Sequence, residues 1–291
     1  MINWQAIATL LCDRIGETRL ELQATSLSGG DISQAFRLVS DRHRFFAKCN
    51  RIELLPMFEA EQTGLDAMRR SRTIRVPEVF ATGVEGDSAF IVMEYIDMSG
   101  PADSDRLAIQ IAGMHGCYHR QFGFDCDNTI GSTAQPNPFS DSWVEFWQRQ
   151  RLGFQLSLGA ERGFEAALLD AGARLNENIG KFFEDYQPEP SLLHGDLWSG
   201  NRGFDGQGNP VIFDPACYYG DHEVDLAMME LFGNPGERFF SVYNEIFPID
   251  DAYPLRRDLY NLYHLLNHAN LFGGGYAGQA LRVIKRLLAQ V

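Results

Sequence analysis

The sequence predicts an α+β protein in which a five-stranded antiparallel sheet precedes a mainly helical region. Up to residue 96, short apolar stretches alternate with glycine-rich or acidic turns, as strands joined by hairpins do. From Leu107 onward, apolar residues recur three and four positions apart, as in amphipathic helices. Residues 98–102, which contain Gly and Pro, separate the two patterns and are the expected linker. We therefore expect two domains, residues 1–97 and 98–291.

Composition limits the class of protein. The 291 residues include 25 Lys and Arg against 39 Asp and Glu, a net charge of −14. This charge repels nucleic-acid phosphates and anionic lipid, so we expect neither nucleic acid nor a membrane as a partner. Five scattered cysteines without a C-x-x-C pair predict free thiols. The N-terminus lacks the basic start of a signal peptide, and the apolar stretches are too short to span a bilayer, so a cytoplasmic protein is expected.

The N-terminal region contains the elements of the predicted sheet. An amphipathic helix over residues 4–15, ending at Gly16, comes first. Helical spacing returns in this region at residues 57–68. The five expected strands are residues 20–23, 36–39, 44–50, 76–83 and 89–96.

A glycine-rich turn joins the first two of these strands. It contains Ser28, Gly29, Gly30 and Ile32, the residues expected to bind nucleotide there. Glycine has no Cβ, so backbone N–H groups in such a turn can approach triphosphate oxygens. An ordinary hairpin has the same pattern, and this turn matches neither the G-x-x-x-x-G-K-[ST] motif nor the full G-x-G-x-x-G motif. Both interpretations of the turn stay open on the sequence.

Lys48 is a lone cation in an apolar strand. Glu61 shares a helix face with Leu65 and Met68, so it could form an ion pair that aims the Lys48 ammonium at the α- and β-phosphates of a nucleotide. Glu59 is the alternative partner, because one residue along a helix turns the side chain by about 100°. The structural alternative for Lys48 is a lysine whose ammonium reaches solvent.

The end of the last predicted strand offers backbone groups to an adenine edge. The residues concerned are Met93, Glu94, Tyr95 and Ile96, which directly precede the linker. Any residue type can make such backbone contacts, so the side chains do not test this prediction.

Helices dominate beyond the linker. An irregular stretch at residues 122–137 is too long for a plain connector and is expected to form part of a substrate rim. Asp221 is a candidate helix cap, and Asp225 could turn inward to hold a loop backbone. Helical spacing appears at residues 107–114, 143–147, 164–169, 221–229, 259–272 and 280–288.

Three polar side chains have the spacing that phosphoryl transfer requires. Asp196 is followed five positions later by Asn201, and Asp214 closes the apolar run at residues 211–213. A turn at residues 206–210 should reverse the chain between them. One carboxylate can orient a substrate hydroxyl, and an amide with a second carboxylate can hold Mg²⁺ against ATP. We expect Asp196 to be the catalytic residue, and Asn201 and Asp214 to be the metal ligands.

With these residues in view, the sequence resembles the fructosamine kinase (ketosamine 3-kinase) family, relatives of the aminoglycoside and choline phosphotransferases. The resemblance spans nearly the whole chain. It implies a protein-kinase-like bilobal fold with an N-terminal ATP-binding lobe and a C-terminal catalytic lobe. Its narrower motifs are HGDLWSGN at 194–201, FDPA at 213–216, YYG at 218–220, LYHLLNH at 262–268 and LFGGGY at 271–276.

The resemblance implies an activity as well. Such an enzyme uses ATP and Mg²⁺ to phosphorylate the 3-hydroxyl of a ketosamine (a fructosamine, ribulosamine or erythrulosamine adduct), small or protein-bound, and so promotes deglycation. Trp198 would offer its ring to the sugar, although a core aromatic that braces the loop is an equal alternative. A monomer or weak homodimer is expected. Several members carry Cys where this chain has Asp31, which puts redox control through that loop in doubt.

Three other functions stay open on the sequence. A kinase for another hydroxyl substrate, of the aminoglycoside or choline type, would share every ATP-binding residue. A non-catalytic nucleotide-binding protein is disfavoured because Lys48, Asp196, Asn201 and Asp214 are all present. A helical interaction protein with incidental motif matches is the third.

Overall fold

The structure of the protein, a computed structural model, describes residues 2–27 and 32–291. The chain divides into two compact units. The first comprises Met1–Ala102 and Gly203–Asp214, and the second comprises Asp103–Arg202 and Pro215–Val291. A single boundary after residue 97 would assign residues 203–214 to the second domain, whereas they group with the first unit.

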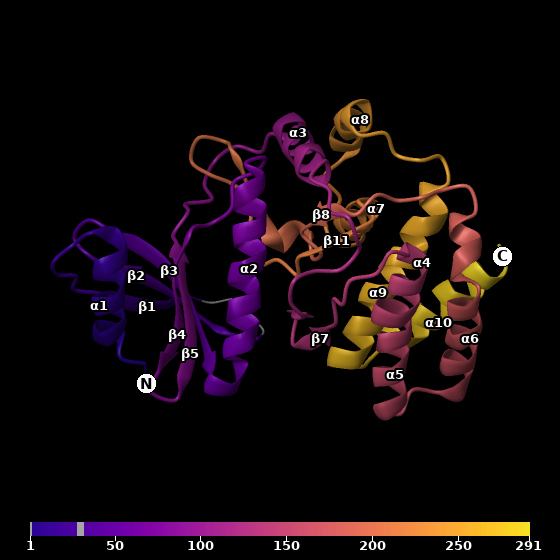
Figure 1. Cartoon of the computed structure of the whole chain (residues 1–291), viewed down its shortest axis with the longest axis horizontal. Helices are drawn as coiled ribbons and strands as arrows, with labels where there is room; N and C mark the ends of the chain where they lie inside the picture. Colours follow the sequence, from indigo (N-terminus) through magenta and orange to yellow (C-terminus); the bar gives the residue numbers. More distant parts are fainter. Residues whose placement is uncertain (1, 28–31) are drawn as a thin grey trace. The chain divides into compact units, whose positions relative to one another are not determined.

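The first unit contains the predicted five-stranded antiparallel sheet (Figure 1). Consecutive strands pair as hairpins, except that β5 lies between β3 and β4, which gives the order β1-β2-β3-β5-β4. The strands are β1 (Gln23–Leu27), β2 (Gln34–Val39), β3 (Arg44–Arg51), β4 (Val79–Glu85) and β5 (Ser88–Glu94).

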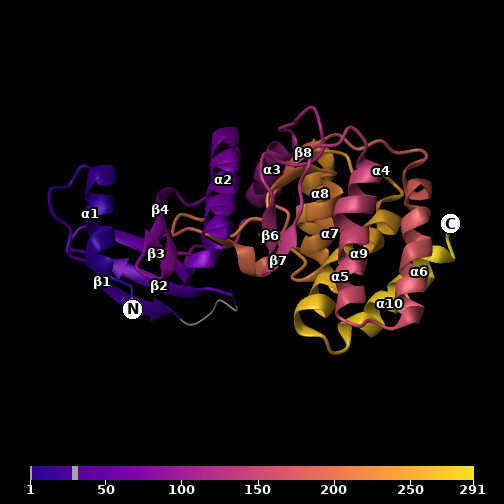
Figure 2. The same cartoon turned by 60° about the horizontal axis from the view of Figure 1, so that its bottom comes forward.

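Two helices, α1 (Trp4–Ile15) and α2 (Leu55–Ser71), cover opposite faces of this sheet (Figures 1 and 2). On β3, Ala47 and its neighbours two positions away lie in the apolar core that includes α1. Because successive side chains of a strand point to opposite faces, Lys48 is directed to the face covered by α2. The end of α1 is as predicted, with Gly16 in the left-handed conformation.

Two strand boundaries differ from the sequence prediction. The strand expected at residues 20–23 is wrong, because β1 begins only at Gln23. Leu20 instead packs in the α1 core, and its carbonyl accepts a hydrogen bond from the Gln5 amide. The strand expected at 76–83 begins three residues late, at Val79, after Pro77, which has no N–H to donate to a ladder.

The turn predicted at residues 206–210 is present between β9 (Arg202–Phe204) and β10 (Pro210–Ile212). The Asp205 carboxylate organises it by accepting hydrogen bonds from the backbone N–H groups of Gln207 and Asn209, each at 2.9 Å. The Ile212 N–H donates to the Arg75 carbonyl at 3.1 Å, which ties this segment to the rest of the first unit. The segment ends at Asp214.

The second unit is mainly helical (Figure 2). The helix predicted from residue 164 begins at Ala166, and the one predicted from residue 221 begins at Glu223. The helices are α3 (Ser104–His115), α4 (Trp143–Phe146), α5 (Gly153–Glu161), α6 (Ala166–Glu177), α7 (Glu223–Leu231), α8 (Glu237–Ile246), α9 (Tyr253–Phe272) and α10 (Tyr276–Leu288).

Sequence reasoning missed α5 and α8. The helix α5 contains two glycines and follows a π-helix at Trp147–Leu152, both of which interrupt ordinary helical spacing. In α8 the signal exists, because Phe239, Val242 and Tyr243 are buried at helical spacing. No helix within residues 2–27 and 32–291 has the length and hydropathy needed to cross a membrane.

Four short strands complete the second unit. The pair β8 (Ser191–Leu193) and β11 (Tyr218–Gly220) is antiparallel. The stretch 122–137, expected to be irregular, contains a small hairpin formed by β6 (Asn128–Ile130) and β7 (Thr133–Gln135). Strands of three residues are too short to show alternation in a sequence.

His264 is a titratable residue of α9 that lies in the protein interior. It is buried, and its Nε2 has no hydrogen-bond partner among the described residues. Burial lowers the pKa of His264 from 6.5 to about 3, with His268 and Arg151 acting in the same direction and Asp225 in the opposite one. Between these two pKa values the imidazole is therefore neutral in the folded protein and protonated in the unfolded chain.

Because the unfolded state binds this additional proton between pH 6.5 and 3, we expect His264 to lower the free energy of unfolding as the pH falls through that range. Its contribution should be about 1.4 kcal/mol per pH unit below 6.5. Urea denaturation between pH 8 and 5 should show a smaller slope against pH for His264→Gln than for the wild type. Parallel curves for the two proteins would contradict this assignment.

Candidate active site

In the first unit, the Lys48 ammonium lies between two carboxylates. Its Nζ is 2.8 Å from Oε1 of Glu61 and 2.7 Å from Oδ1 of Asp214. The ion pair predicted with Glu61 is thus present, rather than the alternative with Glu59. Lys48 is 14% exposed and Glu61 is buried, whereas the Asp214 side chain is 55% exposed. One of the two carboxylates is therefore open to solvent.

The two carboxylates keep Lys48 charged. Burial alone would lower the pKa of Lys48, but the charges and hydrogen bonds of Asp214 and Glu61 together raise it. Burial also raises the pKa of Glu61 to about 7, with Asp214 adding to the increase and Lys48 opposing it. A fixed ammonium beside an exposed carboxylate can accommodate phosphate oxygens and a divalent cation.

Asp214 has an unusual backbone conformation. Its φ is +60°, and within the described part of the chain Arg72 is the one other non-glycine residue with positive φ. This conformation costs roughly 1 kcal/mol for an L-residue, although Asp tolerates it better than most. Such strained residues concentrate at functional sites. The backbone therefore favours Asp214 as a functional residue independently of its ion pair.

In the second unit, Asp196 and Asn201 lie in one closed loop. The Asn201 Nδ2 donates to the Asp196 carbonyl at 2.9 Å and to Oδ2 of the Asp196 carboxylate at 3.0 Å. Asp196 is half-buried. Trp198 is 39% exposed, and its ring covers Gly200, where a Cβ would come within 2.3 Å of the ring. The loop therefore holds the Asp196 carboxylate in a defined place.

The buried Asp225 carboxylate holds the start of this loop, as its position in the sequence suggested. It accepts hydrogen bonds from the backbone N–H groups of His194 at 2.7 Å and Gly195 at 2.8 Å. His115 Nε2 lies 3.2 Å from the same carboxylate. Burial alone would raise the pKa of Asp225, but the interactions with His115 and His194 lower it, so the group is ionised.

Gly195 is required by close packing. Its φ is +80°, and a Cβ at this position would lie 2.1 Å from the Ala216 carbonyl oxygen. The Ala216 N–H donates to the His194 carbonyl at 2.9 Å. The backbone before Asp196 therefore contacts the backbone that follows Pro215 without an intervening side chain.

The residues predicted to contact adenine lie at the end of β5. Met93 is buried within the strand, opposite Phe46 of β3. The Glu94 N–H donates to the Glu78 carbonyl at 2.8 Å, and Tyr95 and Ile96 continue the chain beyond the strand, half-buried.

The glycine-rich turn is described only in part. Ile32 is exposed, and its carbonyl accepts a hydrogen bond from Asn50 Nδ2 at 2.8 Å. Ser28, Gly29, Gly30 and Asp31 lie outside the described residues.

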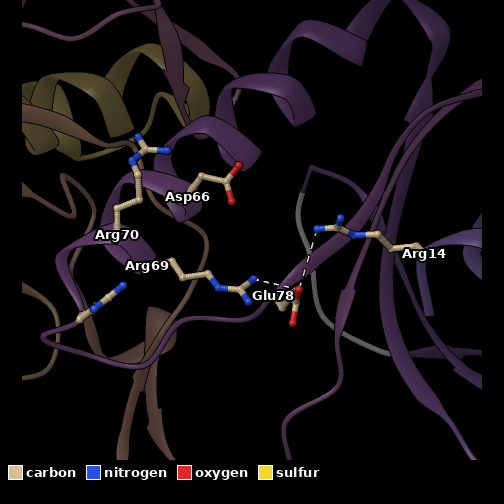
Figure 3. Close-up of a pocket in the computed structure, with 6 residues that line it drawn as sticks. Arg14, Asp66, Arg69, Arg70 and Glu78 are labelled. Carbon is tan, nitrogen blue, oxygen red and sulfur yellow. Dashed lines mark ion pairs between the residues drawn. The ribbon is translucent and has the colours of Figure 1, made fainter. Parts of the chain in front are cut away.

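A pocket of about 330 Å³ lies in the first unit (Figure 3). Arg69 and Arg14 point toward Glu78 from two sides, with N···O distances of 3.1 and 3.9 Å. Its lining consists of Arg14, Asp66, Arg69, Arg70, Arg72 and Glu78, which include none of the described residues predicted to bind nucleotide.

The two predicted metal ligands are oxygen donors, which Mg²⁺ prefers. Among the described residues, no three or more His, Cys, Asp or Glu side chains gather as a metal site. Mg²⁺ is commonly held by one or two protein oxygens together with substrate phosphates and water. Asp214, in the first unit, offers a carboxylate oxygen, and Asn201, in the second unit, offers an amide oxygen.

Three contacts were not foreseen from the sequence. The direct ion pair between Lys48 and Asp214 joins residues with no shared periodicity. The other two are contacts of His115 with Asp225 and, through Nδ1, with the Tyr243 hydroxyl at 2.7 Å. In the sequence, His115 follows Leu107 and Ile111 at helical spacing, and this signal could have indicated that it lies in the core.

Solved structures of other proteins share the fold of this chain. A crystal structure of a candidate fructosamine-3-kinase from Haemophilus somnus superposes with a TM-score of 0.89 at 28% identity, over 98% of this chain and 97% of that one. An aminoglycoside phosphotransferase has a TM-score of 0.66 at 16% identity, over 98% and 99% of the two chains, so it shares the protein-kinase-like fold.

Sequence relatives point in the same direction. A probable ketoamine kinase of Synechocystis is 43% identical over 98% of this chain and 97% of its own. A chloroplastic protein-ribulosamine 3-kinase of Arabidopsis thaliana is 44% identical over 89% and 80%. The fructosamine kinase family model matches residues 3–290. The chain therefore belongs to the fructosamine kinase family.

Proposed function

We propose that this protein is an ATP-dependent kinase that phosphorylates the 3-hydroxyl of ketosamines, and so promotes deglycation of amines and protein lysines. The observation that carries the proposal is the Lys48 ammonium held between Glu61 and the exposed Asp214. The hydrogen bond between Asn201 and the Asp196 carboxylate, and the match to the fructosamine kinase family, support it. The names of the sequence relatives, ketoamine kinase and protein-ribulosamine 3-kinase, support the substrate class.

The proposed roles follow from the charges of the side chains. Lys48, held by Glu61, contacts the α- and β-phosphates of ATP. The substrate 3-hydroxyl oxygen attacks the γ-phosphorus while Asp196 accepts its proton. The bond between the γ-phosphorus and its bridging oxygen breaks, and ADP leaves with that electron pair. Asn201 and Asp214 would hold Mg²⁺, which neutralises phosphate charge when bound.

The remaining predicted contacts belong to the same proposal. The backbone from Met93 to Ile96 contacts adenine, and the turn containing Ser28, Gly29, Gly30 and Ile32 covers the phosphates. Trp198 stacks its exposed face on the sugar, because its other face already packs on Gly200. Cytoplasmic location and a monomer or weak homodimer stay predictions from the sequence.

The first prediction of the proposed function concerns the acceptor. With ATP and Mg²⁺, we expect phosphate transfer to fructosamine and ribulosamine adducts, and NMR should locate the new phosphorus on oxygen 3. Choline and an aminoglycoside serve as matched acceptors for the alternative kinase functions. Transfer to one of these and not to the ketosamines would replace the proposed substrate class, and nucleotide binding without transfer to any acceptor would indicate a non-catalytic protein.

The second prediction concerns the base. Asp196→Asn should lower kcat by about 10² to 10⁴-fold, because a positioned proton acceptor contributes that much. ATP affinity, measured by calorimetry, should stay unchanged. Asp170→Asn, at an exposed position of α6, is the control and should retain wild-type kcat. Unchanged turnover in Asp196→Asn would remove this residue from the base role.

The third prediction concerns the metal ligand. Asp214→Asn should weaken the Mg²⁺-dependent part of ATP binding by about tenfold or more, because a carboxylate ligand of the metal is lost. Calorimetry with ATP in Mg²⁺ and in EDTA separates this part from nucleotide binding itself. Asp87→Asn, exposed in the turn between β4 and β5, is the control. An equal Mg²⁺ effect in both variants would contradict the assignment.

A further inference from the structure

The β6–β7 hairpin places two amide side chains inside the second unit. Asn128 and Gln135 lie opposite each other in the hairpin, and both are buried, with Gln135 at 1% exposure. The sequence had suggested only that this segment forms part of a substrate rim. A buried amide needs partners for its N–H and C=O groups, so the contacts of these two side chains indicate what the hairpin does.

Gln135 makes three hydrogen bonds to three different elements. Its Nε2 donates to Asn128 Oδ1 at 2.8 Å and to the Ala216 carbonyl at 3.1 Å. Its Oε1 accepts from the Tyr263 hydroxyl of α9 at 2.7 Å. Asn128 adds a parallel contact, since its Nδ2 donates to the Cys217 carbonyl at 2.7 Å. The hairpin thus holds the backbone of residues 216 and 217 against α9.

Ala216 in turn contacts the backbone of His194 and Gly195, at the start of the loop that contains Asp196. Its N–H donates to the His194 carbonyl at 2.9 Å, and its carbonyl oxygen packs on Gly195 where no Cβ intervenes. Asp225 accepts the N–H groups of His194 and Gly195. The peptide before Asp196 is therefore fixed by Asp225 through its N–H groups and by Ala216 through the His194 carbonyl.

We propose that Gln135 is a positioning residue for phosphoryl transfer. It fixes Ala216 between α9 and the His194–Gly195 peptide, and through that peptide it fixes the Asp196 carboxylate. All the hydrogen bonds in this connection are within the second unit and join buried groups, where each is costly to leave unmade. The kinetic part of this inference rests on the proposed kinase function, whereas the structural part does not.

The test compares two buried glutamines. Gln135→Met keeps the side-chain volume but removes every hydrogen bond, so kcat should fall by about 10²-fold if a small displacement of Asp196 follows. The KM for ATP should stay at the wild-type value. Gln155→Met is the matched control, because Gln155 is also fully buried and also interacts with the Tyr263 side chain, but its other bonds go to Asn267 and Asn270 and not to Ala216. It should lose similar thermal stability and keep wild-type kcat.

Hydrogen exchange provides a readout that does not need activity. In Gln135→Met the Ala216 amide, which donates to His194, should exchange about tenfold faster, whereas Gln155→Met should leave it protected. If both variants lose kcat equally, or if Gln135→Met changes neither kcat nor Ala216 exchange, the inference is overturned. Failure of the wild type to phosphorylate ketosamines would defeat the proposed function, and the exchange result alone would then decide the inference.

A milder variant covers the case in which Gln135→Met does not fold. Tyr263→Phe removes only the hydroxyl that holds Gln135 Oε1. We expect it to lower kcat by less than Gln135→Met, and to speed Ala216 exchange in the same direction. Wild-type kcat together with wild-type exchange in Tyr263→Phe would contradict the proposed connection between α9 and Asp196.

Discussion

The loop of Asp196 depends on one buried negative charge. Asp225 is inaccessible to solvent and ionised, so its carboxylate must be satisfied by protein donors. Two of these donors are the consecutive N–H groups of His194 and Gly195, and a third contact comes from His115. Because a buried carboxylate without partners costs several kcal/mol, the loop cannot leave this arrangement without a large penalty. A catalytic group that must be placed to within about 0.5 Å benefits from such a constraint.

Much of the site was predictable because short-range geometry controls it. Asn201 follows Asp196 by five positions in a tight loop, so their contact follows from spacing. Strand alternation directs Lys48 to one face of the sheet, and helical spacing directs Glu61 inward, so their ion pair follows from two periodicities. The contact between Lys48 and Asp214 follows from neither, since it depends on how the segment 203–214 packs in the first unit.

Periodic spacing likewise predicted some elements of the fold and not others. The helix α1 and the strands β2 to β5 have periodic patterns, and the sequence predicted their type and their order along the chain. The start of β1 was missed because four of its five residues are exposed, so hydrophobic alternation is absent from that strand. The β6–β7 hairpin has three-residue strands and side chains that are buried amides, which in a sequence suggest a surface loop. Buried polar residues are where pattern reasoning fails, and here they are the ones that hold Ala216.

The choice of acceptor must depend on residues other than those proposed to transfer the phosphoryl group. Transfer of a phosphoryl group needs positioning and charge stabilisation, and the roles proposed for Lys48, Asp196, Asn201 and Asp214 would supply these to any hydroxyl. An aminoglycoside phosphotransferase has the same fold at 16% identity, so the fold does not select the acceptor. Discrimination between acceptors requires contacts to the parts that do not react. Exposed Trp198 follows Asp196, the proposed base, by two positions, so a ring that contacts the sugar would couple acceptor recognition directly to that base.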